Sequence, residues 1–449
     1  MRSRKYSTAL IRLLATVVPL LALAAGTPAV SQSEFVLHNF HLVDGALPGG
    51  ALIADARQNL YGTTYVGGSG NCAYNGPPSG CGTVYKLTHS PEGRWTETVL
   101  YAFQGGSDGE FPFSGLILDQ AGNLYGTTPD GGGLGQVCGL DGCGTVFELS
   151  PPSQPGGSWT ETVLYRFTGG ADQGYPRGTL IFDSKGNLYG VTDVGGYGMN
   201  GTVFQLIPPS TPGGDWTETT LYAFGSHYRD GLYPVAGLAF DESGNLYGTT
   251  GGGGNKGCGT VFQLKPPATS GEWTEKVVHA FQGGTDGSGP TGGLILVRGA
   301  LMSTTENGGQ YDQGTVFQIT PSGGGVSESV VYSFQGGNDG AGPYAGLIAD
   351  SELNLYGTTI GGGALGLEYC TNYPGCGTVF QLTPPAVPGS AWTEKVLYAF
   401  SGGNDGGSPD GSLVLGDGWL LGTASEGGSS QVCDIDGIHG CGVVFAIHK

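Results

Sequence analysis

The 449-residue sequence is poor in charge, in methionine and in long apolar runs. Only 12% of its residues are charged and only three are Met, and no long amphipathic helical pattern follows the first thirty residues. This composition argues against an ordinary helical cytosolic protein. The 37 acidic residues outnumber the 17 basic ones, and so acidic a surface repels nucleic acid and anionic lipid. We expect no nucleic-acid partner, while cations, neutral sugars and basic proteins remain open.

Motifs of common catalytic and phosphate-binding sites are also missing. The chain has no Gly-x-Ser-x-Gly elbow, P-loop or His-Glu-x-x-His run, and its seven histidines come close to a ligand spacing only at His38 and His41. The 90 glycines are spread through the whole chain, which indicates turns rather than a phosphate cradle. The sequence therefore predicts no catalytic residue and no cofactor from motifs, and an enzyme is the less favoured class.

The N-terminus has the features of a secretory signal, with a short basic segment before an apolar run from Leu13 to Ala25. Cleavage is expected after Ser31, with Gly26 as the alternative. An uncleaved anchor is the competing interpretation, but the run is shorter than the ~20 residues that a span needs. We expect residues 1–31 to be a signal peptide, with no membrane insertion after its removal. Residues 32–449 would form one domain of a secreted or periplasmic protein.

One unit recurs seven times along the chain, and its clearest part is Asn-Leu-Tyr-Gly-Thr-Thr. Each unit holds four strand-like runs separated by Gly, Pro, Asn and Asp clusters, as at residues 115–119, 123–128, 144–149 and 159–167. A tight Asp-x-x-Gly-Asn turn joins the first two runs. The motif or its degenerate form begins at Asn59, Asn123, Asn187, Asn245, Ala300, Asn354 and Trp419.

The ends of the chain indicate a closed ring. Several strands are apolar on both faces, which suits a small sheet packed between two neighbours. The seventh unit lacks a fourth strand, and Phe35–Phe40 matches the end of that strand elsewhere, as in Thr98–Phe103. We predict an all-β, seven-bladed β-propeller of four-stranded blades, closed by an N-terminal strand that completes the last blade and removes unpaired edges. A β-solenoid is the alternative.

The repeated pattern Gly-Leu-x-x-Asp-x-x-Gly-Asn-Leu-Tyr-Gly-Thr-Thr, followed by Gly-Thr-Val-Phe-x-Leu, resembles the GloVer (Gloeo/Verruco) tandem repeat of exported bacterial proteins. The resemblance covers nearly all of the chain after the signal, although units five and seven depart from the pattern. It implies a secreted repeat protein without a settled biochemical role. A more distant similarity to kelch and NHL propellers concerns the fold alone, and a fold does not name a function.

Eight of the nine cysteines form local pairs in the loops between second and third strands. In an exported protein we expect each pair to be a disulfide: Cys72 with Cys81, Cys138 with Cys143, Cys370 with Cys376, and Cys433 with Cys441. Cys258 has no local partner, so it is expected to be a free or an intermolecular thiol.

A metal site in the last cysteine loop is a weaker alternative. Residues 433–441 add Asp434, Asp436 and His439 to their two cysteines, and zinc uses Cys and His ligands. The other loops repeat the cysteine pair without the histidine, so a disulfide explains what they share. The Asp-x-Asp-Gly run resembles half of a calcium loop but lacks the later ligands.

One aspartate per unit lies at the junction between consecutive blades. The simpler interpretation is turn geometry, because Asp accepts backbone N–H bonds. The alternative is a ring of carboxylates that binds a cation, with calcium as the candidate. Seven equivalent residues do not separate an acid from a base, so a catalytic pair is disfavoured. These residues are Asp44, Asp108, Asp172, Asp230, Asp286, Asp339 and Asp405.

The cysteine loops and the junction loops are expected on one face, because strands alternate in direction within a blade. That face also gathers aromatic residues, which suit sugar stacking or protein contacts unless they fill their own loops. With the junction aspartates from Asp108 to Asp405, we single out Tyr175, Tyr228 and Tyr344 as ligand-binding candidates. The other aromatic residues are Tyr65, Tyr74, Phe111, Phe113, Tyr197, Tyr233, Tyr311, Tyr369 and Tyr373.

Three functions are left open by the sequence. The first is a non-enzymatic propeller that binds a glycan or another extracellular protein through this loop face. The second is an extracellular lyase or glycosidase, for which the polar run from His227 to Asp230 would be the first place to look. The third is a structural component of the cell envelope.

Overall fold

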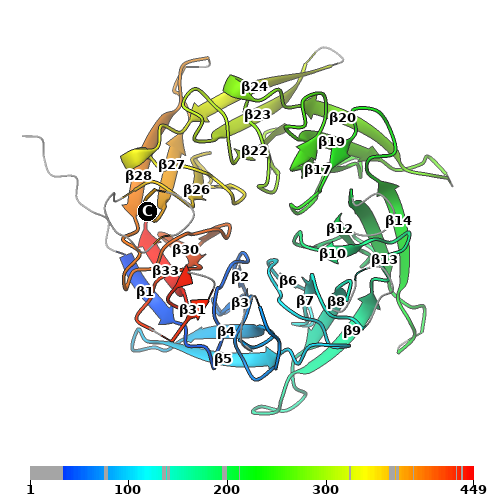
Figure 1. Ribbon diagram of the computed structural model, residues 1–449, viewed down its shortest axis with the longest axis vertical. Coiled ribbons are helices and arrows are strands. Elements are labelled where there is room, and N and C mark those ends of the chain that lie inside the picture. Colours follow the sequence, from blue (N-terminus) through cyan, green and yellow to red (C-terminus); the bar gives the residue numbers. More distant parts are fainter. Residues whose placement is uncertain are drawn as a thin grey trace, which may run out of the picture. The chain divides into compact units, whose positions relative to one another are not determined.

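Seven four-stranded antiparallel sheets form the blades of a ring in the computed structural model (Figure 1). The chain is therefore an all-β, seven-bladed β-propeller, as the sequence predicts. The expected signal peptide lies outside the described residues. These are residues 34–449 except 75–78, 134–137, 139–141, 195–199, 212, 270, 323–324, 364–369, 371–373, 388, 431 and 436–437.

In each blade the first strand is short and the next three are longer. The bounds are as follows: blade 1, β2 (Ile53–Ala54), β3 (Leu60–Thr64), β4 (Thr83–His89) and β5 (Trp95–Ala102); blade 2, β6 (Ile117–Leu118), β7 (Leu124–Thr128), β8 (Thr145–Ser150) and β9 (Thr160–Arg166); blade 3, β11 (Ile181–Phe182), β12 (Leu188–Val194), β13 (Thr202–Ile207) and β14 (Thr217–Ala223); blade 4, β16 (Ala239–Phe240), β17 (Leu246–Thr250), β19 (Thr260–Lys265) and β20 (Thr274–Ala280).

The remaining blades follow the same order, and the last one takes its fourth strand from the other end of the chain. Their bounds are: blade 5, β21 (Ile295–Val297), β22 (Ala300–Thr305), β23 (Thr315–Ser322) and β24 (Gly325–Ser333); blade 6, β25 (Ile348–Ala349), β26 (Leu355–Thr359), β27 (Thr378–Thr383) and β28 (Thr393–Ala399); blade 7, β29 (Val414–Leu415), β30 (Trp419–Ala424), β33 (Val443–His448) and β1 (Glu34–Asn39).

The N-terminal strand closes the ring. Figure 1 shows β1 beside β33, and the two strands pair antiparallel from Glu34 opposite Ile447 to Asn39 opposite Val443. Their register shifts between Val36 and His38. Each of the other six blades has such a bulge between its third and fourth strands. β1 is therefore a fourth strand of the ordinary kind, and the predicted closure is confirmed.

Aromatic rings form the core between neighbouring blades. The third strand of blade 2 buries Phe147 completely, and its ring meets the edge of Phe103 from blade 1 at a centroid distance of 5.1 Å. The same contact recurs at all seven junctions, including Phe40 with Tyr85 across the closure. A glycine in the second strand makes room for the ring, since a Cβ on Gly126 would lie 2.6 Å from Phe147.

The tryptophan at the start of the fourth strand also packs between blades. Trp159 contacts Tyr61 of blade 1, and Trp273 contacts Tyr189 of blade 3. In blade 3 a short fifth strand, β10 (Gly174–Pro176), also pairs with β12. Other short elements lie outside the blade sheets: the pair β15 (Gly231–Leu232) and β18 (Gly252–Gly253), the pair β31 (Asp434–Ile435) and β32 (Ile438–His439), and the 3-10 turns η1 (Gly284–Asp286) and η2 (Gly337–Asp339). Among the described residues, no helix has the length and apolarity to cross a membrane.

Candidate binding site at the channel mouth

Each junction loop is fixed to the cysteine loop of the preceding blade by one repeated backbone bond. The N–H of Phe111, with φ 62°, donates to the carbonyl of Cys81 at 2.9 Å, and Leu47 makes the equivalent bond to Cys441. All seven junctions have this bond, with a residue of positive φ before a proline. Both kinds of loop therefore meet on one face. Five non-glycine residues hold this sparsely populated backbone conformation, which tertiary contacts must over-determine.

The residue that follows this proline lines the axial channel in every blade. Although the loops share one backbone pattern, the seven residues are all different, and five of them have an aromatic, polar or charged side chain. They are Gly49, Phe113, Arg177, Val235, Thr291, Tyr344 and Asp410. A second varied position, which directly follows the end of the second-strand motif, contributes Tyr65, Pro129, Ile360 and Ser425 to the mouth.

A cavity of about 290 Å³ lies at the channel mouth, at the lower end of the range for small-molecule sites. It is lined by the four residues of the second position and by Phe113, Arg177, Tyr344 and Asp410 of the first. One wall is aromatic. The Tyr65 ring stacks on Phe111 at 5.2 Å and meets the edges of Tyr74 and Phe113 at 5.0 and 5.8 Å. Tyr344 lines the cavity from blade 6. The cavity thus combines a broad apolar surface with phenol hydroxyl groups.

Two carboxyl groups of blade 7 lie on the same cavity. Glu426 is buried, with 2% of its surface exposed. Asp410 keeps some exposed surface, but its Oδ1 is shielded from solvent and has no hydrogen-bond partner among the described residues. Burial raises the pKa of Asp410 well above its usual range, and the nearby charge of Glu426 raises it further. Burial and a neighbouring carboxylate both favour the neutral form of the Asp410 carboxyl group.

An ion pair supplies the cationic group of this site. Arg177 Nε lies 3.5 Å from Asp193 Oδ2. Burial raises the pKa of Asp193, while the guanidinium opposes that rise. Burial likewise raises the pKa of Tyr344. The nearby charge of Arg177 lowers this pKa, and that of Asp410 raises it. The mouth thus holds more acidic than basic groups, and it places donors and acceptors around an aromatic wall.

The junction aspartates lie elsewhere, at the ends of the outer strands, where they cap their own turns. Asp108 accepts hydrogen bonds from Tyr101 Oη and the Gln104 backbone N–H, both at 2.7 Å. None of the seven lines the described part of the channel. Their expected role in binding a ligand or calcium stays a prediction. The same pattern of turn capping holds for Asp44, Asp172, Asp230, Asp286, Asp339 and Asp405.

The three predicted tyrosines have separate environments. Tyr344 lines the cavity. Tyr175 lies in β10, where its backbone N–H bonds to Cys143. Tyr228 is 88% exposed, with the Arg229 guanidinium 5.0 Å from its ring, and the run from His227 to Asp230 lines a separate hollow away from the channel. Of the other aromatic candidates, Tyr197, Tyr369 and Tyr373 lie outside the described residues.

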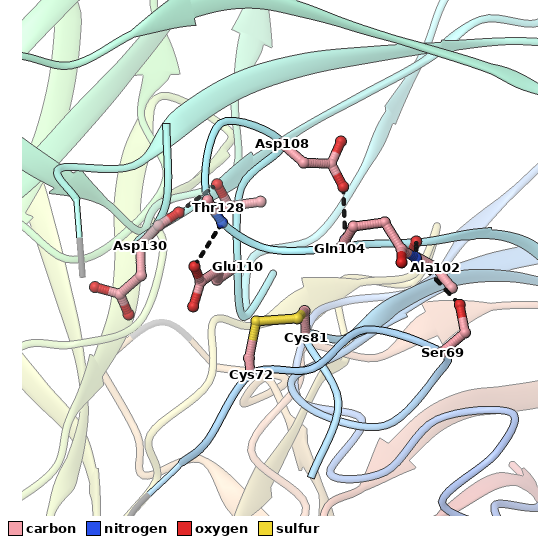
Figure 2. Close-up of a disulfide and its surroundings, with 10 residues drawn as sticks. Ser69, Cys72, Cys81, Ala102, Gln104, Asp108, Glu110, Thr128 and Asp130 are labelled. Carbon is pink, nitrogen blue, oxygen red and sulfur yellow. Dashed lines mark hydrogen bonds between the residues drawn. A yellow bond between two sulfur atoms is a disulfide. The ribbon is translucent and has the colours of Figure 1, made fainter. Parts of the chain in front are cut away.

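All four expected disulfides are present, and each closes a loop on the same face as the channel mouth. Figure 2 shows the Cys72–Cys81 bond beside the junction loop that carries Asp108 and Glu110. Because Cys433 and Cys441 are joined, they are not thiolate ligands, and the zinc alternative for their loop is wrong; Asp436 of that loop lies outside the described residues. Cys258 is a free thiol. Four disulfides are typical of an extracellular or periplasmic protein.

Sequence reasoning missed Asp410, Glu426, Arg177 and Asp193. Most of the residues that it selected recur from unit to unit, whereas these four occupy positions that vary between units. The signal was present in the alignment of the seven units: the residue after the repeated proline changes every time. Without the ring, nothing indicated that these varied positions converge on one cavity.

The fold and its asymmetric mouth define a seven-bladed propeller built from tandem repeats. The family model of the Gloeobacter/Verrucomicrobia repeat matches residues 133–369 and 267–449. These overlapping matches cover more than half of the chain, and the protein therefore belongs to this repeat family. No curated protein matches the sequence.

Solved structures that match the chain do so with low TM-scores. A glucose dehydrogenase-type oxidoreductase from Thermus thermophilus shares 16% identity, over 73% of this chain and 94% of that chain, with a TM-score of 0.40. Trypanosoma rangeli sialidase shares 11%, over 80% and 57%, at 0.41. A protein of unknown function from Dyadobacter fermentans shares 12%, over 80% and 96%, at 0.41. At these scores we draw no functional argument from them.

Proposed function

We propose that this protein is a secreted, non-enzymatic propeller that binds a glycan in the cavity at its channel mouth. One observation carries the proposal: the positions that vary between otherwise regular blades converge there, and they bring together aromatic rings, carboxyl groups and an arginine. Aromatic faces stack on the apolar faces of sugar rings, and the polar groups can fix the hydroxyl groups around them.

The charge at the mouth selects among glycans. Even without Asp410, the two carboxyl groups of Glu426 and Asp193 outnumber Arg177, which is already paired with Asp193. The whole chain also has a formal net charge of −20. Polyuronates and sulfated glycans would meet repulsion, so neutral glycans and glycans with amino groups are the favoured ligands. A protein partner, the other candidate from the sequence, would need a basic segment narrow enough to enter the mouth.

Isothermal titration calorimetry tests the proposal directly. Cello-, xylo- and chito-oligosaccharides are titrated into the purified protein, with polygalacturonate as the anionic comparison. We expect binding to at least one uncharged or amino-bearing series and none to polygalacturonate. Tyr344→Ala should weaken that binding about tenfold or more, equivalent to about 1.4 kcal/mol. The matched control is Tyr228→Ala, an exposed tyrosine outside the cavity, which should leave it unchanged. Equal losses in both variants would contradict the proposal.

A hydrolase or lyase is the second candidate, and the Asp410–Glu426 pair favours it. Two carboxyl groups in different environments, one with a raised pKa, are the arrangement that general acid and base catalysis requires. Release of reducing or unsaturated ends from the bound oligosaccharide would establish this function. Asp410→Asn would then abolish turnover while retaining affinity. Binding without turnover in the unmodified protein supports the non-enzymatic proposal.

A further inference from the structure

A second set of carboxyl groups lies between the blades, on the outer strands and away from the channel. The Glu of the fourth strand in one blade approaches the junction aspartate that follows the preceding blade. Burial, together with the charge of that aspartate, raises the pKa of the glutamate. The arrangement recurs at all seven junctions: Glu34 with Asp405, Glu97 with Asp44, Glu161 with Asp108, Glu218 with Asp172, Glu275 with Asp230, Glu328 with Asp286, and Glu394 with Asp339.

A third residue, from the fourth strand that precedes the aspartate, divides the seven junctions into two kinds. In five of them a tyrosine of the preceding fourth strand donates its hydroxyl to the aspartate, as Tyr101 does to Asp108. In the other two a histidine takes the place of the tyrosine. His38 Nε2 lies 3.4 Å from Asp44 Oδ2, and His279 Nε2 lies 3.2 Å from Asp286 Oδ1. An acceptor-capable imidazole thus replaces a phenol donor at just two of the seven junctions.

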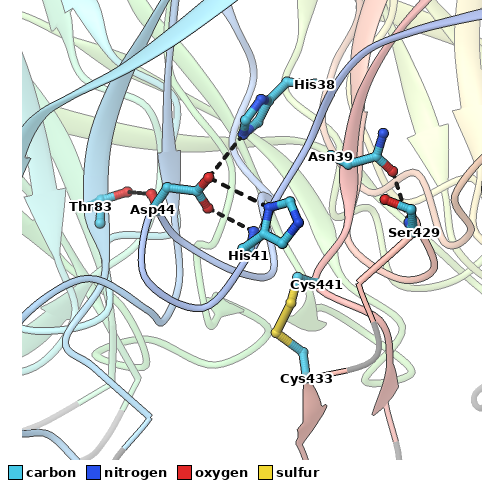
Figure 3. A network of polar contacts seen from close by, with 8 residues as sticks. All are labelled: His38, Asn39, His41, Asp44, Thr83, Ser429, Cys433 and Cys441. Atoms are coloured by element: carbon cyan, nitrogen blue, oxygen red, sulfur yellow. Dashed lines mark hydrogen bonds and ion pairs between the residues drawn. A yellow bond between two sulfur atoms is a disulfide. The ribbon is translucent and has the colours of Figure 1, made fainter.

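Both histidine junctions have the geometry of a metal site. We name them the closure triad (His38, Asp44 and Glu97) and the blade-5 triad (His279, Asp286 and Glu328). Within each triad, one ligand atom from every residue lies within 4.8 Å of the others. Figure 3 shows His38 and His41 directed toward the Asp44 carboxylate. His41 is mostly exposed, with its Nδ1 3.8 Å from Asp44 Oδ2, so it stands at the rim of the closure triad.

Each triad contains a glutamate oxygen without a hydrogen-bond partner. Glu97 Oε1 and Glu328 Oε1 are shielded from solvent and have no partner among the described residues, a feature that four tyrosine junctions share at Glu34, Glu161, Glu275 and Glu394. In the closure triad, His38 Nε2 is also shielded and makes no hydrogen bond among the described residues. Shielded polar atoms without a partner are costly. Two facing carboxylates also repel each other unless a proton or a cation lies between them. A cation held by one nitrogen and two carboxylate oxygens would satisfy all three residues at once.

We propose that each triad binds one divalent transition-metal ion, with Zn²⁺ as the best-matched cation. Imidazole and carboxylate ligands suit zinc, whose protein sites with an open position use three such ligands. Calcium prefers six to eight oxygen ligands, more than either triad offers. Each ion would join two blades, because the histidine and the glutamate come from neighbouring blades. At the closure triad the ion would connect β1 of blade 7 to β5 of blade 1.

The tyrosine junctions provide variants that the fold already accepts. His38→Tyr and His279→Tyr convert each triad into the form found at the other five junctions, so both variants are expected to fold. His227→Ala is the matched control, since this exposed histidine lies outside both triads. Neither the triads nor these variants include a residue of the channel mouth, so this test and the glycan test succeed or fail independently.

The experiment is titration of metal-free protein with ZnCl₂ at pH 7.5, followed by calorimetry and by native mass spectrometry. We expect two ions per chain, one ion in either single variant, none in the double variant, and two in His227→Ala. Zinc should also raise the melting temperature of the unmodified protein, and this rise should disappear in the double variant. No binding to the unmodified protein, or an unchanged stoichiometry in the double variant, would overturn the proposal.

Discussion

The blades and the channel mouth are built from the same seven repeats, but the packing contacts of the blades are repeated whereas the residues at the mouth vary. A backbone bulge recurs within each blade, and an aromatic edge contact and an Asp–Glu pair recur between neighbouring blades with little change. At the mouth, the residue after the junction proline is different in all seven blades, from Gly49 to Asp410. The repeated contacts hold the ring together, and they leave the residues at the mouth free to vary without loss of the fold.

This comparison assigns stability to one region and binding to the other. A change at a repeated contact should alter the free energy of unfolding, and a change at the mouth should not. The closure within blade 7, where β1 pairs with β33, is the repeated contact on which the ring depends most, because it joins the two ends of the described chain.

Deletion of Glu34–Phe40 should have the largest effect. It removes β1, leaves β33 with an unpaired edge, and takes Phe40 from the core contact with Tyr85. We expect loss of the cooperative melting transition, or a very large fall in its temperature, by circular dichroism. The control is a chain that begins at Glu34. A deletion variant that melts like this control would refute closure by β1.

Phe262→Ala should have the next largest effect. Phe262 is fully buried and meets Phe224 of the preceding blade at 5.0 Å. Removal of a buried aromatic ring typically costs about 3–5 kcal/mol of the free energy of unfolding. Tyr344→Ala at the mouth should cost far less. Urea denaturation of both variants measures the difference, and equal losses would break the division between blades and mouth.

The Asp–Glu pairs should make the protein less stable as the pH rises. Burial, together with the neighbouring aspartate, raises the pKa of Glu161 to about 7 and that of Glu394 to about 8, from an ordinary 4.5. The folded state therefore binds more protons than the unfolded state above pH 4.5, and unfolding becomes easier as the pH passes through 7 to 8. We expect the melting temperature, measured in EDTA, to fall by several degrees between pH 5 and pH 8.

Below about pH 4 the protein should become less stable as the pH falls, because of a different set of aspartates. Although burial opposes it, hydrogen bonds from Asn187 and its neighbours lower the pKa of Asp183 in the first hairpin, and Asp350 is held in the same way. Their contribution is lost as the pH falls below about 4. Glu161→Gln should reduce the fall in melting temperature between pH 5 and pH 8. A melting temperature that is constant or rises from pH 5 to pH 8 would contradict this account of the pairs.

Tyr85→Phe should give the smallest effect, and it should be stabilising. The other six blades have phenylalanine at this position, whereas the Tyr85 hydroxyl is fully buried without a hydrogen-bond partner among the described residues. Removal of such a group should raise the free energy of unfolding by about 1 kcal/mol. The reverse change, Phe147→Tyr in blade 2, should lower it. A destabilised Tyr85→Phe variant would show that this hydroxyl has a partner.

The fold was predictable because its determinants lie within single units and recur. The Asn-Leu-Tyr-Gly-Thr-Thr motif located the second strand, and the match of Phe35–Phe40 to a fourth strand located the closure. The disulfides followed from cysteine spacing in the same loops. The predicted first strand at residues 115–119 was too long, since only Ile117 and Leu118 pair; the preceding residues turn from the channel into the sheet.

The sites were less predictable because each depends on packing between blades. Asp410 and Arg177 are more than 200 residues apart in the chain, yet both line the channel mouth. The glutamate at the start of the fourth strand was visible in the sequence, in five units as part of Trp-Thr-Glu. Its approach to the aspartate of the preceding blade depends on how neighbouring blades pack. Sequence reasoning placed the junction aspartates at turns, and it could not identify the side chains that face them.

The most direct test of the division between blades and mouth is one double variant measured in two ways. Tyr344→Ala with Asp410→Asn changes the cavity alone, and both its melting temperature and its affinity for the best oligosaccharide are compared with the unmodified protein. We predict a melting temperature within a few degrees of the unmodified protein and no detectable binding. Retained affinity, or a collapse of stability comparable to that of Phe262→Ala, would contradict the account.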